Sequence, residues 1–427
     1  MSAPTPYDRL PYDSFPFAQT HPAHLCALAR LHGVNAPDPR NARVLEIGCA
    51  SGGNLIPMAE QLPFASFVGL DLSARQISMA KSAAAEANVH NVTFTHANVA
   101  TYDGAGQHYD YIIAHGVYSW MPETARDAQM QVCEQCLTDT GIAYISYNTY
   151  PGWHLRGAIR DMMMYHASGF ESDAQQVQQA RSLLNFLQEN ASTGADAYSL
   201  LLEREATILA NSADAYIRHE HLSGDNVPLY FHQFATKAAG FSLKFLAEAE
   251  LSSHSTANLT DAAKEAIDSL CQDVIRREQY LDFLRNRTFR QSLLVQDGVP
   301  TLPSAQAPLL DSLALSANLT RTSQDEVQQS FTFSAQNGTS LATSDPLLTA
   351  ALTELLNRKP DRLSAHALVN SAADEAQRES GFPLSRDLPS RLERRDRTAA
   401  PPRLRTYRAT DGYSAERVPG MGALSPS

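Results

Sequence analysis

Apolar residues in the first 150 positions follow two alternating patterns. Short apolar runs, which are typical of buried strands, alternate with segments whose apolar residues recur every three or four positions, as on one face of a helix. The short runs predict strands at 44–47, 65–70, 92–95, 109–114 and 142–147. Strand–helix alternation at this spacing predicts an α/β fold with a Rossmann-like, doubly wound parallel sheet, which binds ligands at the carboxyl ends of its strands.

The helical period dominates from Gly152 onward. It predicts helices at 153–168, 175–190, 199–221, 230–240, 259–275 and 278–290, with one strand-like run at 241–246. A Pro-containing segment at 300–308 predicts a linker. An alternating run at 327–343 around Asn337-Gly338 predicts a hairpin, which is followed by an amphipathic helix at 346–357. Hairpin and helix together predict a winged-helix-like unit that is cut short.

These patterns divide the chain into four regions. We expect a ligand-binding α/β domain at 1–165, a mainly helical middle domain at 166–300 and a partial winged-helix-like unit at 309–370. Residues 371–427 are rich in Arg, Pro and Ser and poor in apolar residues, which predicts a disordered tail. At the other end, the first 24 residues interleave aromatic side chains with Pro, Asp and Ser. We expect an arm there that packs on the first domain or covers its ligand.

The net charge of the chain limits the classes of molecule that it is expected to bind. The net charge is −12, and residues 371–427 carry +2, so residues 1–370 carry −14. An acidic body argues against nucleic acid as a partner and favours a basic or neutral substrate. Because no apolar run approaches 18 residues and no N-terminal segment resembles a signal peptide, we expect a soluble, cytoplasmic protein without a membrane span.

The five scattered cysteines give little sign of metal or redox chemistry. Cys133 and Cys136 form a CxxC pair, but no second pair accompanies it and the region has a helical pattern. We therefore expect buried thiols and no metal site.

A glycine-containing turn follows the first predicted strand. Gly48, Ala50 and Gly53 take the three positions that glycines hold in a dinucleotide-binding turn. Such a turn lets backbone N–H groups approach a ligand closely, and the next helix points its N-terminus at the same place. Two cofactor classes bind at turns of this kind: the dinucleotides of oxidoreductases and S-adenosyl-L-methionine.

Three polar residues at strand ends favour S-adenosyl-L-methionine. The Glu46 carboxylate would repel a pyrophosphate, but it suits a sulfonium-bearing amino acid with a free ammonium. Asp71 ends the second strand, where a carboxylate can accept both ribose hydroxyls. Asn98 follows the third strand, where an amide can contact adenine. The plain alternatives are a tight turn for Gly48 and Gly52, a surface acid for Glu46, a neighbour of a helix cap for Asp71 and an ordinary loop residue for Asn98. The full set of expected cofactor-binding residues is Glu46, Gly48, Cys49, Ala50, Gly52, Asn54, Asp71, Leu72, Asn98, Val99 and His115.

The ends of the fourth and fifth strands are expected to face the methyl acceptor. The segment at 115–120 follows the fourth strand, where amine-directed methyltransferases often carry a polar group beside an aromatic ring. We expect acceptor-side catalytic roles for His115, Tyr118 and Tyr147. Aromatic faces attract ammonium groups, so Tyr150 and Trp153 are expected to contact the substrate. Packing is the alternative for each aromatic side chain.

With these residues assembled, the chain resembles bacterial class I methyltransferases that carry a methyltransferase regulatory domain. The resemblance covers about residues 7–360. Its first part lies in the segments 12–22, 44–57, 115–122 and 147–154. Its second part lies in 219–222, 226–231, 245–249 and 279–291.

The characterised members that this architecture is similar to are protein-lysine methyltransferases that act on rickettsial outer-membrane proteins. The resemblance therefore implies a lysine side chain as acceptor and a protein as partner. Two alternatives stay open: a small molecule or glycan as acceptor, and a cofactor-binding interaction protein without turnover. The sequence does not indicate an oligomeric state.

Overall fold

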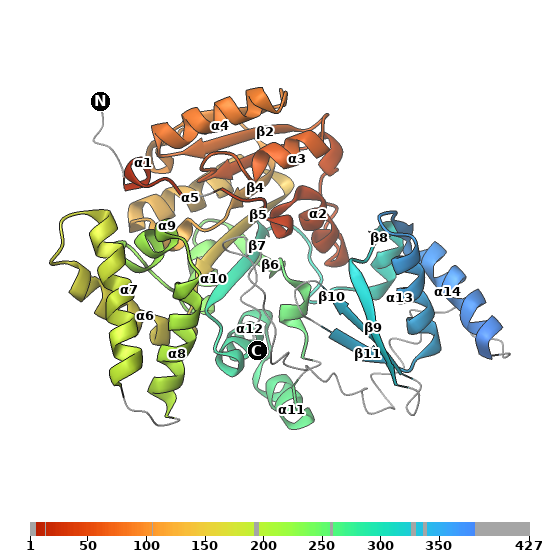
Figure 1. The fold of residues 1–427 in the computed structure, drawn as a ribbon. Coiled ribbons are helices and arrows are strands. Elements are labelled where there is room, and N and C mark those ends of the chain that lie inside the picture. Colours follow the sequence, from red (N-terminus) through yellow and green to blue (C-terminus); the bar gives the residue numbers. More distant parts are fainter. Residues whose placement is uncertain are drawn as a thin grey trace.

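The computed structural model describes residues 6–12, 14–104, 106–191, 196–256, 259–325, 330–335 and 340–380. At its centre lies a seven-stranded sheet with the order β3-β2-β1-β4-β5-β7-β6 (Figure 1). The strands are β1 (Arg43–Ile47), β2 (Ser66–Asp71), β3 (Val92–His96), β4 (Tyr109–Ala114), β5 (Leu137–Asn148), β6 (Leu243–Glu248) and β7 (Phe289–Gln296). The first five pair in parallel, which confirms the predicted Rossmann-like sheet.

Helices cover both faces of this sheet because its central strands are apolar on both sides. Along β1, Val44 packs with α2 (Pro22–Leu31), α3 (Leu55–Gln61) and α4 (Ala74–Glu86) on one face. Leu45 points to the other face, against α5 (Glu123–Cys136) and α10 (Phe231–Ala239). The two-residue period of a strand thus divides the core into two layers.

The two last strands of the sheet come from the region that was expected to be mainly helical. The helix predicted at 278–290 is α12 (Val274–Arg285), and Asn286 ends it in the left-handed conformation with φ of 47°. Strand β7 begins three residues later and pairs antiparallel with β5 and β6. The pairing partners are distant in sequence, so the helical period alone did not reveal this strand. The boundary at 165/166 stays a prediction.

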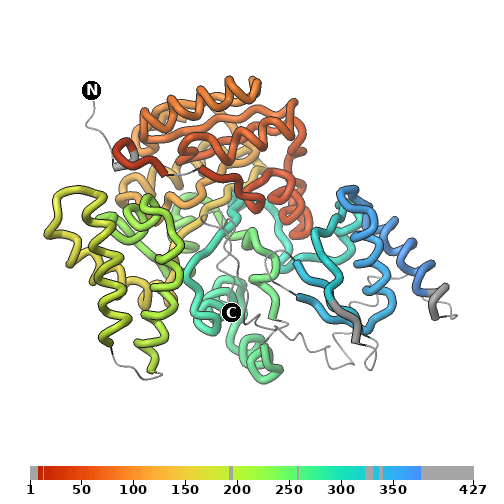
Figure 2. Tube along the Cα trace, viewed as in Figure 1, coloured from red at the N-terminus to blue at the C-terminus, as the bar shows by residue number. Residues whose placement is uncertain are grey.

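A separate helical bundle follows β5 (Figure 2). It contains α6 (Gly152–Ala167), α7 (Asp173–Asn190), α8 (Ala197–Ala210), α9 (Asp214–Tyr216) and a turn of π-helix, η5 (Ile217–His221). Ile159, Val177 and Leu202 belong to its own apolar core. The single helix predicted at 199–221 is therefore interrupted after Ala210.

The C-terminal unit contains the predicted hairpin, whose strands β10 (Ser330–Ala335) and β11 (Ser340–Thr343) pair antiparallel. Their turn at Asn337-Gly338 lies outside the described residues. Strand β9 (Leu319–Asp325) extends this sheet. The remaining elements of the unit are η7 (Ala307–Ser312), β8 (Ala314–Leu315), α13 (Pro346–Asn357), β12 (Leu363–Ser364) and α14 (Ala365–Ser380).

Two predictions for the C-terminal third need correction. Helix α14 continues to Ser380, beyond residue 371, where disorder was expected to begin; residues 381–427 lie outside the described part. The segment predicted as a linker at 300–308 is docked on the end of α2. The backbone N–H of Leu302 donates to His32 O at 2.8 Å, and that of Gln306 donates to Leu31 O at 2.9 Å.

Seven further elements complete the described part of the chain. They are α1 (Pro6–Arg9), η1 (Ala18–Thr20), η2 (Pro39–Asn41), η3 (Val99–Thr101), η4 (Tyr118–Trp120), η6 (Leu251–His254) and α11 (Asp261–Leu270). None of the described helices is long and apolar enough to cross a membrane.

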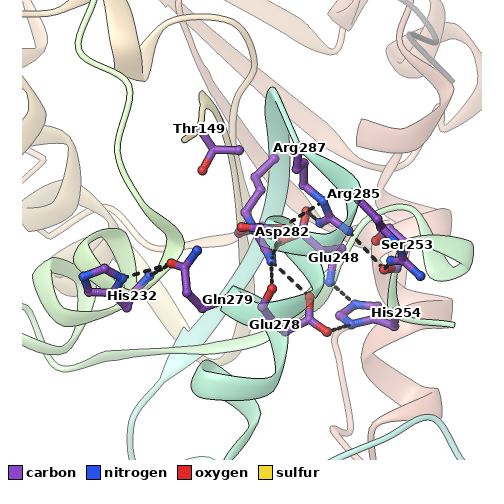
Figure 3. Close-up of polar contacts among 12 residues, drawn as sticks. Thr149, His232, Glu248, Ser253, His254, Glu278, Gln279, Asp282, Arg285 and Arg287 are labelled. Atoms are coloured by element: carbon purple, nitrogen blue, oxygen red, sulfur yellow. Dashed lines mark hydrogen bonds and ion pairs between the residues drawn. The ribbon is translucent and has the colours of Figure 1, made fainter. Parts of the chain in front are cut away.

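A buried ionic cluster fastens β6, β7 and α12 together (Figure 3). Arg290 is fully buried and donates hydrogen bonds to Glu248 at 2.7 Å, Asp282 at 2.8 Å and Glu278 at 3.1 Å. His254 approaches Glu278 from the other side, with Nδ1 and Oε1 2.8 Å apart. Each carboxylate has a positively charged or hydrogen-bonding partner, as buried charges require.

The same cluster supports the residues that follow β5. The turn between α12 and β7 accepts a hydrogen bond from the Gly152 N–H at Arg287 O (2.9 Å) and one from the Thr149 N–H at Thr288 O (2.9 Å). A Cβ on Gly152 would come within 2.5 Å of Asn286 O, so only glycine allows this approach. The ionic cluster therefore positions the start of α6 at the carboxyl edge of the sheet.

The substitution Arg290→Met tests this role. It would leave three buried acidic side chains without their common cation, and we expect the free energy of unfolding to fall by about 3–5 kcal/mol. Urea denaturation followed by tryptophan fluorescence measures the change, since Trp120 and Trp153 both lie near the end of β5. Arg40→Met is the control, because the pair of Arg40 with Asp38 is on the surface. Equal midpoints for the two variants would contradict the prediction.

Candidate functional site

The turn after β1 is shaped by two glycines with positive φ. Gly48 has φ of +77° and Gly52 has φ of +82°, and a Cβ on Gly48 would come within 2.3 Å of the Val117 side chain. The N–H groups of Gly48 and Cys49 both donate to Leu70 O, at 2.7 and 3.0 Å. The turn is thereby fixed between the carboxyl ends of β1, β2 and β4, where the sequence predicted the cofactor.

Glu46 places a buried carboxylate beneath this turn. Its side chain is 3% exposed, and Oε1 accepts a hydrogen bond from Asn54 Nδ2 at 2.7 Å. Oε2 is buried and has no hydrogen-bond partner among the described residues. Burial raises the pKa of Glu46 to about 8, and the nearby Asp71 adds to the rise. A positively charged ligand group would supply what this oxygen lacks.

Asn54 connects Glu46 to the N-terminal arm. Its Oδ1 accepts the Phe17 N–H at 2.8 Å, and its Nδ2 also donates to Thr20 Oγ1 at 3.0 Å. Every polar atom of the Asn54 amide is engaged by protein, and a cofactor contact of this residue stays a prediction. Ser14 adds a second tie, since its Oγ accepts the Gly53 N–H at 2.8 Å.

Asp71 ends β2 and holds the turn from the other side. Its Oδ2 accepts the Ala50 N–H at 2.9 Å, and its Oδ1 accepts the Ser73 N–H at 2.8 Å. Burial raises the pKa of Asp71, although these two N–H groups lower it. Each oxygen keeps a further lone pair, which allows the carboxylate to accept ligand hydroxyls.

Four other residues were expected to contact the cofactor, namely Cys49, Leu72, Asn98 and Val99. Leu72 is 46% exposed and Val99 is buried. The exposed Asn98 uses its Oδ1 to accept the Ala100 N–H at 2.9 Å, so its side chain caps η3. Cys49 is buried, and a Cβ on Gly69 would come within 2.8 Å of its Sγ. The cofactor contacts of these four residues stay predictions.

His115 lies at the end of β4 under the arm. Its Nδ1 is 2.8 Å from Tyr144 OH, and its ring centroid is 4.0 Å from that of Phe17. Nε2 is buried and without a hydrogen-bond partner among the described residues. Burial lowers the pKa of His115 to about 3, so the imidazole is neutral at physiological pH. A neutral imidazole can orient an amine, but it is too weak a base to deprotonate an ammonium.

Tyr118 and Tyr147 are placed in the core. Their exposed fractions are 0% and 1%, and both rings pack on Phe234 of α10, which Tyr147 stacks at 4.0 Å between centroids. The Tyr147 hydroxyl lies 3.3 Å from Ser292 Oγ on β7. This placement argues against the predicted acceptor-side catalytic roles, because α10 covers both rings. The sequence could not show this, since α10 lies more than 80 residues downstream.

The two expected substrate-binding residues differ in accessibility. Tyr150 is partly exposed and stacks on His154 at 4.0 Å between ring centroids. Trp153 is 2% exposed, and its indole N–H is buried with no partner among the described residues. The guanidinium of Arg156 lies 5.2 Å from its ring centroid. Tyr150 is thus available to a substrate at the surface, and Trp153 supports the layer beneath.

These residues fit S-adenosyl-L-methionine. The Oε2 atom of Glu46 offers a negative partner to an amino-acid ammonium, and the carboxylate of Asp71 can accept ribose hydroxyls. The backbone of 48–52 lies between them and has no side chain at its two glycines. By contrast, the described residues contain no group of three or more His, Cys, Asp or Glu that could hold a metal ion.

Comparison with known proteins assigns two segments of the chain. Residues 44–141 match the model of a methyltransferase domain, and residues 213–296 match the model described as a predicted methyltransferase regulatory domain. The structure of PKMT2 from Rickettsia typhi in complex with AdoHcy matches with a TM-score of 0.78 and 31% identity, over 90% of this chain and 74% of that one.

The chain belongs to the S-adenosylmethionine-dependent methyltransferases with a regulatory domain. Two uncharacterised proteins of Rickettsia prowazekii are further relatives of this methyltransferase. One is 43% identical over 68% of the chain, and the match spans 52% of that relative's length. The other is 38% identical over 56% of the chain, and the match spans 96% of its length.

The structure also identifies contributors that the sequence did not single out. Ser14 and Thr20 of the arm engage the glycine turn and Asn54, and Tyr144 engages His115. The aromatic residues of the arm were a usable signal, because they predicted a segment that packs on the first domain or covers its ligand. The two hydroxyl residues lie in the segment 12–22, which carries part of the family resemblance, but the sequence assigned neither of them a role.

The substitution Asp71→Asn tests the ribose-binding role. Loss of charge-assisted hydrogen bonds should weaken AdoHcy binding by about 1–3 kcal/mol in isothermal titration calorimetry. Asp110→Asn is the matched control. The Asp110 carboxylate also accepts a hydrogen bond from a backbone N–H, that of Arg43 at 2.8 Å, but it lies at the opposite edge of the sheet. Unchanged affinity of the Asp71 variant would remove this residue from the site.

The substitution Glu46→Gln tests the buried carboxylate through its pH dependence. A carboxyl group whose folded-state pKa is raised to about 8 destabilises the ligand-free protein as pH rises from its unfolded-state pKa toward 8. The variant should therefore melt higher than the parent at pH 8.5, with a smaller difference at pH 6, and bind AdoHcy more weakly at both. Differential scanning calorimetry and titration calorimetry measure these effects. A variant that melts lower at both pH values would contradict the prediction.

Proposed function

We propose that the chain is a methyltransferase that transfers the methyl group of S-adenosyl-L-methionine to a lysine side chain of a protein. The observation that carries the cofactor part is the unpaired, buried Oε2 of Glu46 beneath the glycine turn. The acceptor part is supported by the resemblance to rickettsial protein-lysine methyltransferases and by the match to PKMT2 along 74% of its length. The acidic charge of residues 1–370 suits a basic acceptor.

In this proposal, residues at the carboxyl edge of the sheet bind different parts of S-adenosyl-L-methionine. Glu46 would hold the ammonium of the methionyl group, Asp71 the ribose hydroxyls and the 48–52 backbone the part between them. When bound, the cofactor supplies an electrophilic methyl group on a sulfonium. The protein's task is to align an acceptor nitrogen with that methyl group and to exclude water.

The arm completes the enclosure. Phe17 covers His115, while its backbone N–H is fixed by Asn54. An aromatic face beside the transfer site favours a sulfonium through cation–π attraction. His115 is neutral because of its lowered pKa, and its Nε2 can form a hydrogen bond with the acceptor amine.

Transfer of label identifies the acceptor. The full chain is incubated with tritiated S-adenosyl-L-methionine and a lysate of the organism that encodes it, and labelled proteins are hydrolysed for amino-acid analysis. We expect label in a protein band, as methyllysine. Asp71→Asn should lower this label, and Asp110→Asn should leave it unchanged. Label only in small molecules or glycans would overturn the lysine assignment, and no label would favour a binding protein without turnover.

A further inference from the structure

A second group of buried polar atoms lies beyond the end of β5, outside the cofactor residues. The Trp153 indole N–H, Arg160 Nε and both ring nitrogens of His221 are buried and have no hydrogen-bond partner among the described residues. Beside them, Glu220 is 9% exposed, and its charge interacts with those of Arg156 and Arg160. Buried polar groups without partners are rare, so such a cluster marks a place that a ligand completes.

The backbone that presents Glu220 is itself unusual. Glu220 lies in the π-helical turn η5, and turns of this kind occur frequently at functional sites. The preceding residue, His219, is fixed through Nε2 to Leu10 O of the arm at 2.8 Å. Its ring also lies against Tyr12, with 5.6 Å between centroids. The arm that covers the cofactor turn therefore also contacts the turn that carries Glu220.

Contacts with the ends of β4 and β5 place this turn at the acceptor side. Just after it, the Val227 N–H donates to Ser119 O at 2.8 Å, and Asn226 accepts a hydrogen bond from Asn148 at 3.0 Å. Helix α6, which begins directly after β5, packs against η5. Acceptors of an open α/β sheet enter at this edge.

The proposed lysine acceptor creates a need that His115 does not meet. A lysine side chain in water is an ammonium, and it must lose a proton before its nitrogen can attack a methyl group. We propose that Glu220 receives the acceptor ammonium and takes up its proton, as the general base of the reaction. This inference rests on the proposed function and names a second carboxylate site for it.

The proton and electron balance is simple. One proton leaves the lysine ammonium and binds a carboxylate oxygen of Glu220. The neutral nitrogen uses its lone pair to form a bond with the methyl carbon, the carbon–sulfur bond breaks and its electron pair stays on sulfur. The positive charge of the sulfonium ends on the methylated lysine, and Glu220 returns its proton to water.

The charges around Glu220 suit this task. Burial raises the pKa of Glu220 to about 7, although Arg156 and Arg160 lower it. A pKa of about 7 is near the value that a general base needs at neutral pH. The same two guanidinium groups would disfavour an ammonium beside them and so promote its deprotonation. The titratable and charged groups that interact with Glu220, Arg156 or Arg160 are Asp161, Glu205, Tyr216, His221 and Asp225.

The pH–rate profile of Glu220→Gln tests the inference. The substrate is the lysate protein that the tritium experiment identifies as methyl acceptor, used in its unmethylated form. The variant keeps the volume of the side chain and removes the base. At pH 7 we expect kcat to fall at least about 100-fold. The loss should shrink as pH approaches about 10, where lysine deprotonates without help. The AdoHcy affinity and the melting temperature should stay near those of the parent.

Two further variants separate a base from a structural acid. Glu220→Asp keeps a carboxylate and should recover part of kcat; it carries the test if the Gln variant melts early. Glu203→Gln removes an exposed acid from α8 and should leave the profile unchanged. A Glu220→Gln profile parallel to that of the parent, or Asp no better than Gln, would overturn the inference while methyllysine formation by the parent still supports the proposed function. If the parent forms no methyllysine, both fail.

Discussion

The cofactor edge depends on one costly arrangement, the burial of the Glu46 carboxylate. Removing a charge from water is unfavourable unless a partner compensates it, and Asn54 satisfies only one of the two oxygens. A cationic ligand group at the remaining oxygen would complete the electrostatic balance of this part of the fold. Because Asn54 also binds the Phe17 backbone, the same amide connects the carboxylate to the arm that covers it. A ligand bound at Glu46 would therefore be connected to the position of the arm through Asn54.

The acceptor side depends on a different buried charge. Arg290 gathers three carboxylates and thereby fixes the turn before β7, against which Thr149 and Gly152 pack. This cluster is saturated with partners, so it gives rigidity and needs no ligand. The contrast with Glu46 is informative, because a fully paired buried charge serves the scaffold while an incompletely paired one indicates a binding site.

Glu46 and Glu220 both have the features of an incompletely paired buried charge. Each is a buried carboxylate with a raised pKa, and each lies where a cation is expected, the methionyl ammonium for one and the acceptor lysine for the other. The first would face a ligand charge that persists through the reaction. The second would face a charge that must disappear before transfer, which is the condition under which a base with a pKa near 7 is useful. In this proposal the neutral His115 would orient the amine without competing for its proton.

The sequence by itself determined the parallel sheet, the glycine turn and the strand-end acids Glu46 and Asp71, because strand periodicity and a turn with positive φ are local properties of the chain. It also pointed to the cofactor class. Only the tertiary structure decided that α10 buries Tyr118 and Tyr147, that β7 replaces the end of a predicted helix and that the Asn54 amide binds the arm. Each of these outcomes depends on pairing or packing between segments tens to more than a hundred residues apart, and no local pattern encodes which distant segment will arrive.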